Sequence, residues 1–182
     1  MTTVIIQPSS QDAFADENDK ANPHNGAYFA LRNSGGKNCI SYVQFDLSSL
    51  VGKTILSAVF WGKITLENTP GPPHPSSVDL RRCTQAWNEA TLDWSPQPAV
   101  SGTLLATAAY REGLGWKDWT LDLTEFGLMI ASNNGFRIKC EPTDQGGNDW
   151  QRYDSSEGPV GADKPKLVVE YAGVGGQIIW IT

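Results

Sequence analysis

Apolar and polar residues alternate with a period of two along most of this chain. In SYVQFDL (41–47), Val43, Phe45 and Leu47 share one parity. In TILSAVFWGKITL (54–66), the residues of one parity are Leu56, Ala58, Phe60, Ile64 and Leu66. Because successive side chains of a strand point to opposite faces, each pattern predicts a strand with one buried face.

The same alternation predicts further strands, with turn residues between them. These strands are Val78 to Cys83, Leu104 to Tyr110, Trp119 to Leu123, Phe136 to Cys140 and Leu167 to Tyr171. About eight evenly spaced strands predict an all-β fold, an antiparallel β-sandwich of the jelly-roll type. One short helix is expected in TEFGLMIAS (124–132), with Thr124 as its cap, Asn134 and Gly135 at its end, and a place at one end of the sandwich.

Turn-rich composition and acidic charge narrow the class of protein. The 182 residues include 18 glycines and 11 prolines and carry a net charge of −6. We expect one domain over residues 1–172, followed by an apolar C-terminal tail, 173–182. The negative charge argues against nucleic acid as a partner, since such surfaces are normally basic. No apolar run approaches the roughly 18 residues of a membrane span, so no membrane partner is expected.

The three cysteines, Cys39, Cys83 and Cys140, are far apart in the sequence. An odd number without close spacing excludes a CxxC site and gives no sign of a disulfide framework. We therefore expect all three to be small, buried apolar residues of strands.

A tryptophan-rich segment, WNEATLDWSPQP (87–98), stands out from the strands, and we call it the tryptophan corner. Pro96 and Pro98 lack N–H donors, so the segment is an irregular connection. Trp87 and Trp94 flank a polar turn and are expected to pin this connection to an apolar core. The corner is thus predicted to be structural.

The order of these motifs resembles the DNRLRE-type domains, which are non-catalytic jelly-roll modules akin to carbohydrate-binding modules and occur in many secreted surface proteins. The resemblance runs from about residue 4 to Tyr171. Its motifs are DAF at Asp12, NPHNG at Asn22, the stretch Tyr28 to Leu50, the tryptophan corner, GWKDWTLDLT (115–124), NNGFRIK (133–139), and YDSSEG with KPKLVVEY (153–171). The resemblance implies a binding or structural role, and the loops 70–75 and 146–150 and the tail depart from the family pattern.

An enzyme is not expected. The only histidines, His24 and His74, lie in separate polar loops, which disfavours a catalytic triad or a histidine-rich metal site. Glu89 and Asp93 could in principle form a carboxylate pair like that of a glycosidase, but both lie in the tryptophan corner, where an acidic side chain more often caps a turn.

An acidic stretch near the N-terminus raises the question of a metal. Asp12, Asp16 and Asp19 are the tentative ligands of a structural calcium, because calcium takes six to eight oxygens from loops of this kind. There is no EF-hand spacing. We favour a solvated acidic loop, with no cofactor, over this calcium site.

Sugar binding depends on exposed aromatic side chains. Trp61 points away from Phe60 on its strand, and Trp150 follows a glycine-rich loop with Arg152 close by. These three residues are the tentative carbohydrate-binding set, and packing on a second sheet is the alternative for both tryptophans.

Assembly is the third hypothesis, and the favoured one. The chain has no N-terminal signal pattern and ends in the apolar residues Ile178, Ile179, Trp180 and Ile181, which are predicted either to add a strand to a neighbouring subunit or to fold back on their own sandwich. We therefore expect a virion component, a phage decoration or tail-adhesion protein contacting virion proteins or further copies of itself. The alternative is an extracellular, stand-alone carbohydrate-binding module that binds polysaccharide.

Overall fold

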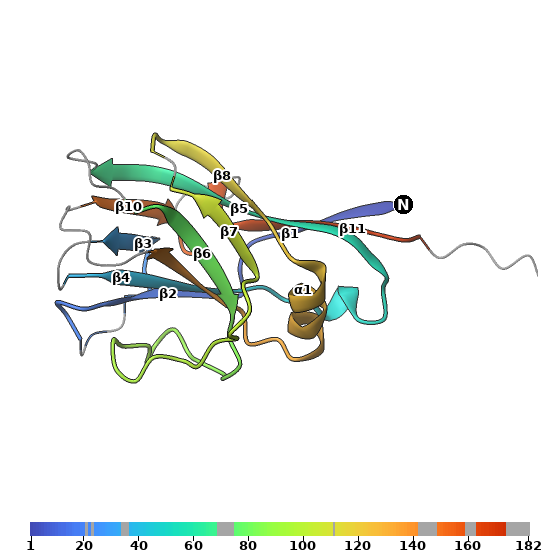
Figure 1. The fold of residues 1–182 in the computed structure, drawn as a ribbon, viewed down its shortest axis with the longest axis horizontal. Coiled ribbons are helices and arrows are strands. Elements are labelled where there is room, and N and C mark those ends of the chain that lie inside the picture. Colours follow the sequence, from blue (N-terminus) through green and yellow to red (C-terminus); the bar gives the residue numbers. More distant parts are fainter. Residues whose placement is uncertain are drawn as a thin grey trace, which may run out of the picture.

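The computed structural model describes residues 1–20, 22, 24–33, 37–68, 75–110, 112–141, 149–158 and 163–173. Within these ranges the chain forms eleven strands, one α-helix and one 3₁₀ helix (Figure 1). They are β1 (Thr2–Ile6), β2 (Gln11–Asp16), β3 (Tyr28–Asn33), β4 (Cys39–Gln44), η1 (Ser48–Leu50), β5 (Ile55–Asn68), β6 (Ser77–Arg82), β7 (Ala106–Ala109), β8 (Gly115–Thr120), α1 (Leu123–Ala131), β9 (Phe136–Glu141), β10 (Asp149–Asp154) and β11 (Lys166–Tyr171).

All strand pairs are antiparallel, and they form one strongly curled sheet in the order β1-β11-β5-β10-β3-β4-β9-β6-β7. β8 pairs with β5, and β2 pairs with β4. The curl brings two layers face to face around a core, which confirms the predicted antiparallel β-sandwich. Strands β10, β3, β4 and β2 lie side by side at the end away from α1 (Figure 1).

The long strand β5 shows how alternation builds the core. Ala58, Phe60 and Ile64 are buried with aromatic side chains from the facing strands, as their parity predicts. Phe60 lies 5.4 Å from Trp119 and 5.0 Å from Phe136, measured between ring centres. Leu56 and Leu66 share this parity but are 47% and 46% exposed, so their predicted burial is wrong. They lie near the two ends of the fourteen-residue strand, outside the buried stretch from Ala58 to Ile64.

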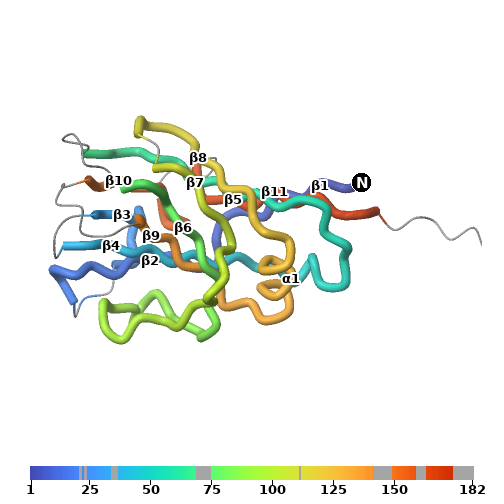
Figure 2. Tube along the Cα trace, in the orientation of Figure 1, coloured from blue at the N-terminus to red at the C-terminus, as the bar shows by residue number. Residues whose placement is uncertain are grey.

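The tryptophan corner forms a second, smaller core. Ala13, Ala15, Ile40, Tyr42, Cys83 and Leu92 are buried together, and Trp87, Trp94 and Val100 pack against them; we call this group the corner cluster. The Trp87 indole N–H donates to the carbonyl of Asn134 at 2.8 Å, which fixes the ring. Figure 2 shows the corner as the light-green stretch beside β2 and β4. The predicted packing of Trp87 and Trp94 on an apolar core is confirmed.

The helix α1 lies at one end of the sheet, beside η1 (Figure 1). Phe126 and Met129, on the inner face of the helix, are buried. Asp122, rather than the predicted Thr124, is the N-cap, because its carboxylate accepts from the Glu125 N–H at 2.9 Å. No helix in the described part of the chain is long and apolar enough to cross a membrane.

The three cysteines agree with the prediction from the sequence, whereas several strands differ from it. Cys39, Cys83 and Cys140 are free and buried, as predicted, although Cys83 forms only an isolated bridge. Burial raises the pKa of each thiol to about 12. The sequence missed β1, β2 and β10. The strand predicted over 119–123 overlaps only the last two residues of β8, which ends at Thr120, and its last residue, Leu123, already belongs to α1.

Candidate functional site

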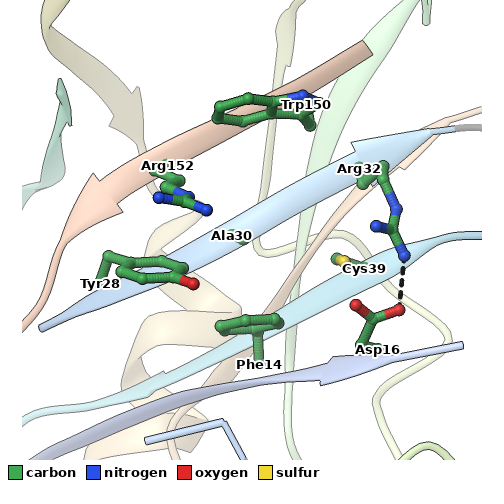
Figure 3. A pocket seen from close by; sticks show the side chains of 8 residues that line it. All are labelled: Phe14, Asp16, Tyr28, Ala30, Arg32, Cys39, Trp150 and Arg152. Atoms are coloured by element: carbon green, nitrogen blue, oxygen red, sulfur yellow. Dashed lines mark hydrogen bonds and ion pairs between the residues drawn. The ribbon is translucent and has the colours of Figure 1, made fainter. Parts of the chain in front are cut away.

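Four neighbouring strands form a groove with a volume of about 280 Å³ (Figure 3). We call it the stacking groove. Strand alternation positions its side chains: on β3, Phe29 and Leu31 enter the core, while the residues between and beside them line the groove. The lining residues are Phe14 and Asp16 on β2, Tyr28, Ala30 and Arg32 on β3, Cys39 on β4, and Trp150 and Arg152 on β10.

The centre of the groove is an arginine between two aromatic rings. Cζ of Arg152 lies 4.3 Å from the centre of the Tyr28 ring and 5.2 Å from the centre of the Trp150 ring. Arg152 pairs with Ala30, whose small side chain leaves room for the guanidinium beside Tyr28. Such contacts are worth about 0.5–2 kcal/mol each and hold the guanidinium in place.

The stack continues onto β2. The Tyr28 and Phe14 ring centres are 5.7 Å apart with the ring planes inclined by 26°, and Phe14 stacks on the His24 imidazole at 4.5 Å. The Phe14 N–H also donates to the His24 carbonyl at 3.0 Å. The row from Trp150 to His24 is therefore prearranged across the strands.

The polar ends of the central groups are available for a ligand. Within the described residues, the Tyr28 hydroxyl, the Trp150 indole N–H and the Arg152 guanidinium have no hydrogen-bond partner. Arg32 differs, since it forms a 2.5 Å ion pair with Asp16 and donates to the Lys37 carbonyl. The groove thus combines aromatic rings with unused donors, a combination that suits a sugar ring and its hydroxyl groups.

Of the three residues predicted to bind carbohydrate, the structure brings two together. Trp150 and Arg152 meet in the groove, on a strand rather than on the predicted loop. Trp61 lies elsewhere, at the β5 position paired with Lys166 of β11 and Asp118 of β8. It shares the outer face of these strands with Trp116, which has Lys166 over its ring at 4.3 Å.

Sequence reasoning missed Phe14 and Tyr28. The sequence shows that Trp150 and Arg152 lie on the same face of a strand. The aromatic rings beside them come from β3 and β2, through the pairing of β10 with β3 and the contact of β2 with β3. Those pairings join segments far apart in the sequence. The only early signal was the aspartate–aromatic motif at Asp12 to Phe14.

The tentative calcium ligands are not gathered at one point. Asp16 pairs with Arg32, and Asp19 accepts from Asn22 and lies 3.8 Å from the His24 imidazole. Within the described ranges, no group of three or more histidine, cysteine, aspartate or glutamate side chains is arranged to hold a metal ion.

Asp12 is instead buried beneath the turn that follows β10. Its carboxylate accepts from the Ser9 hydroxyl at 2.5 Å and the Ser156 N–H at 2.9 Å. Burial raises the pKa of Asp12 to about 6, and these hydrogen bonds oppose the rise. Asp12 therefore ties β2 to the turn after β10.

The residues considered for catalysis have structural partners. Asp93 accepts from the Ser95 N–H at 2.8 Å and so caps a turn, as expected, and Glu89 accepts from the Asp12 N–H at 3.3 Å. His24 stacks on Phe14. The predicted assembly residues Ile178, Ile179, Trp180 and Ile181, and His74, lie outside the described residues.

Comparison with known proteins identifies the family of the chain. No curated protein matches the chain. The family model of carbohydrate-binding module family 96 matches residues 4–171, almost the whole described sandwich. This match confirms the resemblance to carbohydrate-binding modules, a class of non-catalytic binding domains. The chain belongs to carbohydrate-binding module family 96.

Proposed function

We propose that the protein binds a polysaccharide in the stacking groove, without catalysing a reaction on it. The single observation that carries this proposal is the Arg152 guanidinium between the Tyr28 and Trp150 rings, with the polar ends of all three groups unused within the described residues. Family membership supports the same function class.

The chemistry of these groups defines what the ligand must offer. The Arg152 guanidinium and the Trp150 indole only donate hydrogen bonds, whereas the Tyr28 hydroxyl both donates and accepts. A ligand therefore needs several acceptor oxygens around an apolar face, as a pyranose ring has. The rings and the guanidinium are already stacked, so binding costs little side-chain ordering.

The test is binding to a panel of soluble neutral polysaccharides and soluble polyuronates, measured by affinity electrophoresis and calorimetry. Trp150→Ala and Arg152→Met should each weaken binding of the retained polysaccharide about 10- to 30-fold, the loss typical of a central aromatic or arginine anchor. Trp61→Ala is the matched control and should bind like the wild type. Retention of none of the polysaccharides, or loss of binding in the control alone, would refute the groove as the site.

The virion role, a location in the virion, and the finer DNRLRE-type assignment remain hypotheses. The proposed assembly through the tail concerns residues outside the described ones, so its test is independent of the groove. If the tail assembles subunits, removal of residues 173–182 should lower the number of subunits per particle, measured by light scattering. An unchanged number of subunits per particle would count against tail-mediated assembly and leave the polysaccharide proposal intact.

A further inference from the structure

A second pocket lies on the other side of β2 and β4, against the tryptophan corner. Its volume is about 240 Å³. We call this site the corner pocket, and six of its lining residues are Glu17, Asn38, Trp94, Gln97, Arg137 and Lys139. Asp16 and Cys39 line the stacking groove, whereas their neighbours Glu17 and Asn38 line the corner pocket. The two sites therefore open on opposite sides of the same strand ends.

Arg137 is the unusual group in this pocket. It is half-buried on β9, opposite Tyr42 of β4 and Arg81 of β6. Among the described residues, its buried Nε atom has no hydrogen-bond partner and its guanidinium forms no ion pair. The terminal Nη atoms are not buried and have no hydrogen-bond partner among the described residues, so they are the donors that a ligand in the pocket can reach.

The other charged residues of the pocket are already paired. Lys139 Nζ donates to Glu141 at 2.8 Å. One carboxylate oxygen of Glu17 accepts from the Asn38 N–H at 3.0 Å and from the Asn38 side-chain amide at 2.9 Å. Glu17 is thus held by Asn38 and does not neutralise Arg137.

Trp94 and Gln97 supply an aromatic face and an amide next to this guanidinium. Trp94 packs on the corner cluster and is half-buried, so its ring is held in place. Within the described ranges, neither the Trp94 indole N–H nor the Gln97 amide has a hydrogen-bond partner. An indole, an amide and a guanidinium with unused polar ends repeat the chemistry of the stacking groove.

The pocket extends along the corner. Gln97 also lines a neighbouring hollow of about 150 Å³, together with Trp87, Gln85 and Asn88. The side-chain oxygens of Gln85 and Asn88 accept from backbone N–H groups at 3.3 and 2.8 Å, which orients both side-chain amides. Two adjoining hollows that share one amide provide room for neighbouring sugar units of one chain.

We propose that the tryptophan corner is a second polysaccharide-binding site, in which a pyranose ring packs on Trp94 and its oxygens accept from Arg137 and Gln97. This inference rests on the proposed function, because it takes the same class of ligand. Two sites on opposite sides of one domain engage two stretches of polymer at once, and the second contact benefits from a raised effective concentration.

The experiment counts sites by calorimetry with an oligosaccharide cut from the polysaccharide that the panel retains. The wild type should bind two oligosaccharides per chain, and Arg137→Gln and Trp150→Ala should each bind one. Gln97→Ala is a second corner variant, chosen because Gln97 makes no hydrogen bond with the described part of the chain. Thermal melting checks that every variant is folded. Affinity for the whole polymer should fall about 10-fold when either site is removed.

The outcomes separate this inference from the proposed function. One oligosaccharide per wild-type chain, lost in Trp150→Ala and unchanged in both corner variants, would overturn the corner site and leave the groove standing. Binding lost only in the corner variants would support the corner and refute the groove. No binding of any polysaccharide would refute both.

Discussion

The stacking groove and the corner pocket share one support, strand β2, but are built differently. Phe14 and Asp16 of β2 line the groove, while Ala13 and Ala15 enter the corner cluster. The groove consists of strand residues whose places follow from the sheet register. The corner is an irregular loop, so its pocket depends on buried anchors that hold the loop to the sheet. Regular pairing fixes the first surface, and packing of a loop fixes the second.

Removal of a corner anchor should separate the two surfaces most strongly. Leu92 is buried in the corner cluster at 4% exposure. Leu92→Ala should lower the free energy of unfolding by about 2–4 kcal/mol, the usual cost of a cavity at such a site. Urea denaturation measures this loss. Calorimetry should still show ligand bound in the groove, and a folded Leu92→Ala protein without groove binding would contradict the separation.

The pH dependence of stability should report on the attachment of strand β2, which supports both surfaces. Because the folded state raises the pKa of Asp12 from 3.8 to about 6, it holds the proton more tightly than the unfolded chain. The stabilisation is fully present below about pH 4 and is lost as the pH rises through about 6. This shift corresponds to roughly 2–3 kcal/mol.

Urea denaturation between pH 4 and 7 checks this effect, with Asp12→Asn as the comparison. The difference in unfolding free energy between wild type and variant should change across that window in the direction given. A pH-independent difference would show that the Asp12 proton does not control the attachment of β2.

The smallest expected effect concerns the second arginine of the groove. Asp16→Asn removes the ion pair with Arg32, and the stability loss should be only about 0.5–1 kcal/mol, since both side chains are partly exposed. The freed guanidinium and the lost negative charge should tighten binding of a polyuronate, by up to about fivefold. Weaker polyuronate binding in Asp16→Asn would mean that the ion pair itself shapes the groove.

Local patterns in the sequence predicted the parts of the fold that have one buried and one open face. β5 and β9 alternate clearly, and Trp150 and Arg152 share one parity. β2 was missed because Asp12 to Ala15 are buried on both faces, which removes the alternation. Tyr28 could not be joined to Arg152, because their contact depends on the non-local pairing of β10 with β3. The unused guanidinium of Arg137 likewise depends on three-dimensional packing.

The most direct test of the central claim is nuclear magnetic resonance of the indole N–H groups during titration with the bound oligosaccharide. Assignment by single tryptophan-to-phenylalanine substitutions identifies each signal. The Trp150 signal should shift strongly, since Trp150 lines the groove and its indole N–H has no partner in the described residues, while the Trp61 and Trp116 signals should stay in place. Shifts of Trp61 and Trp116 with an unmoved Trp150 would place the sugar on the outer face of β5 and β8 and contradict the account.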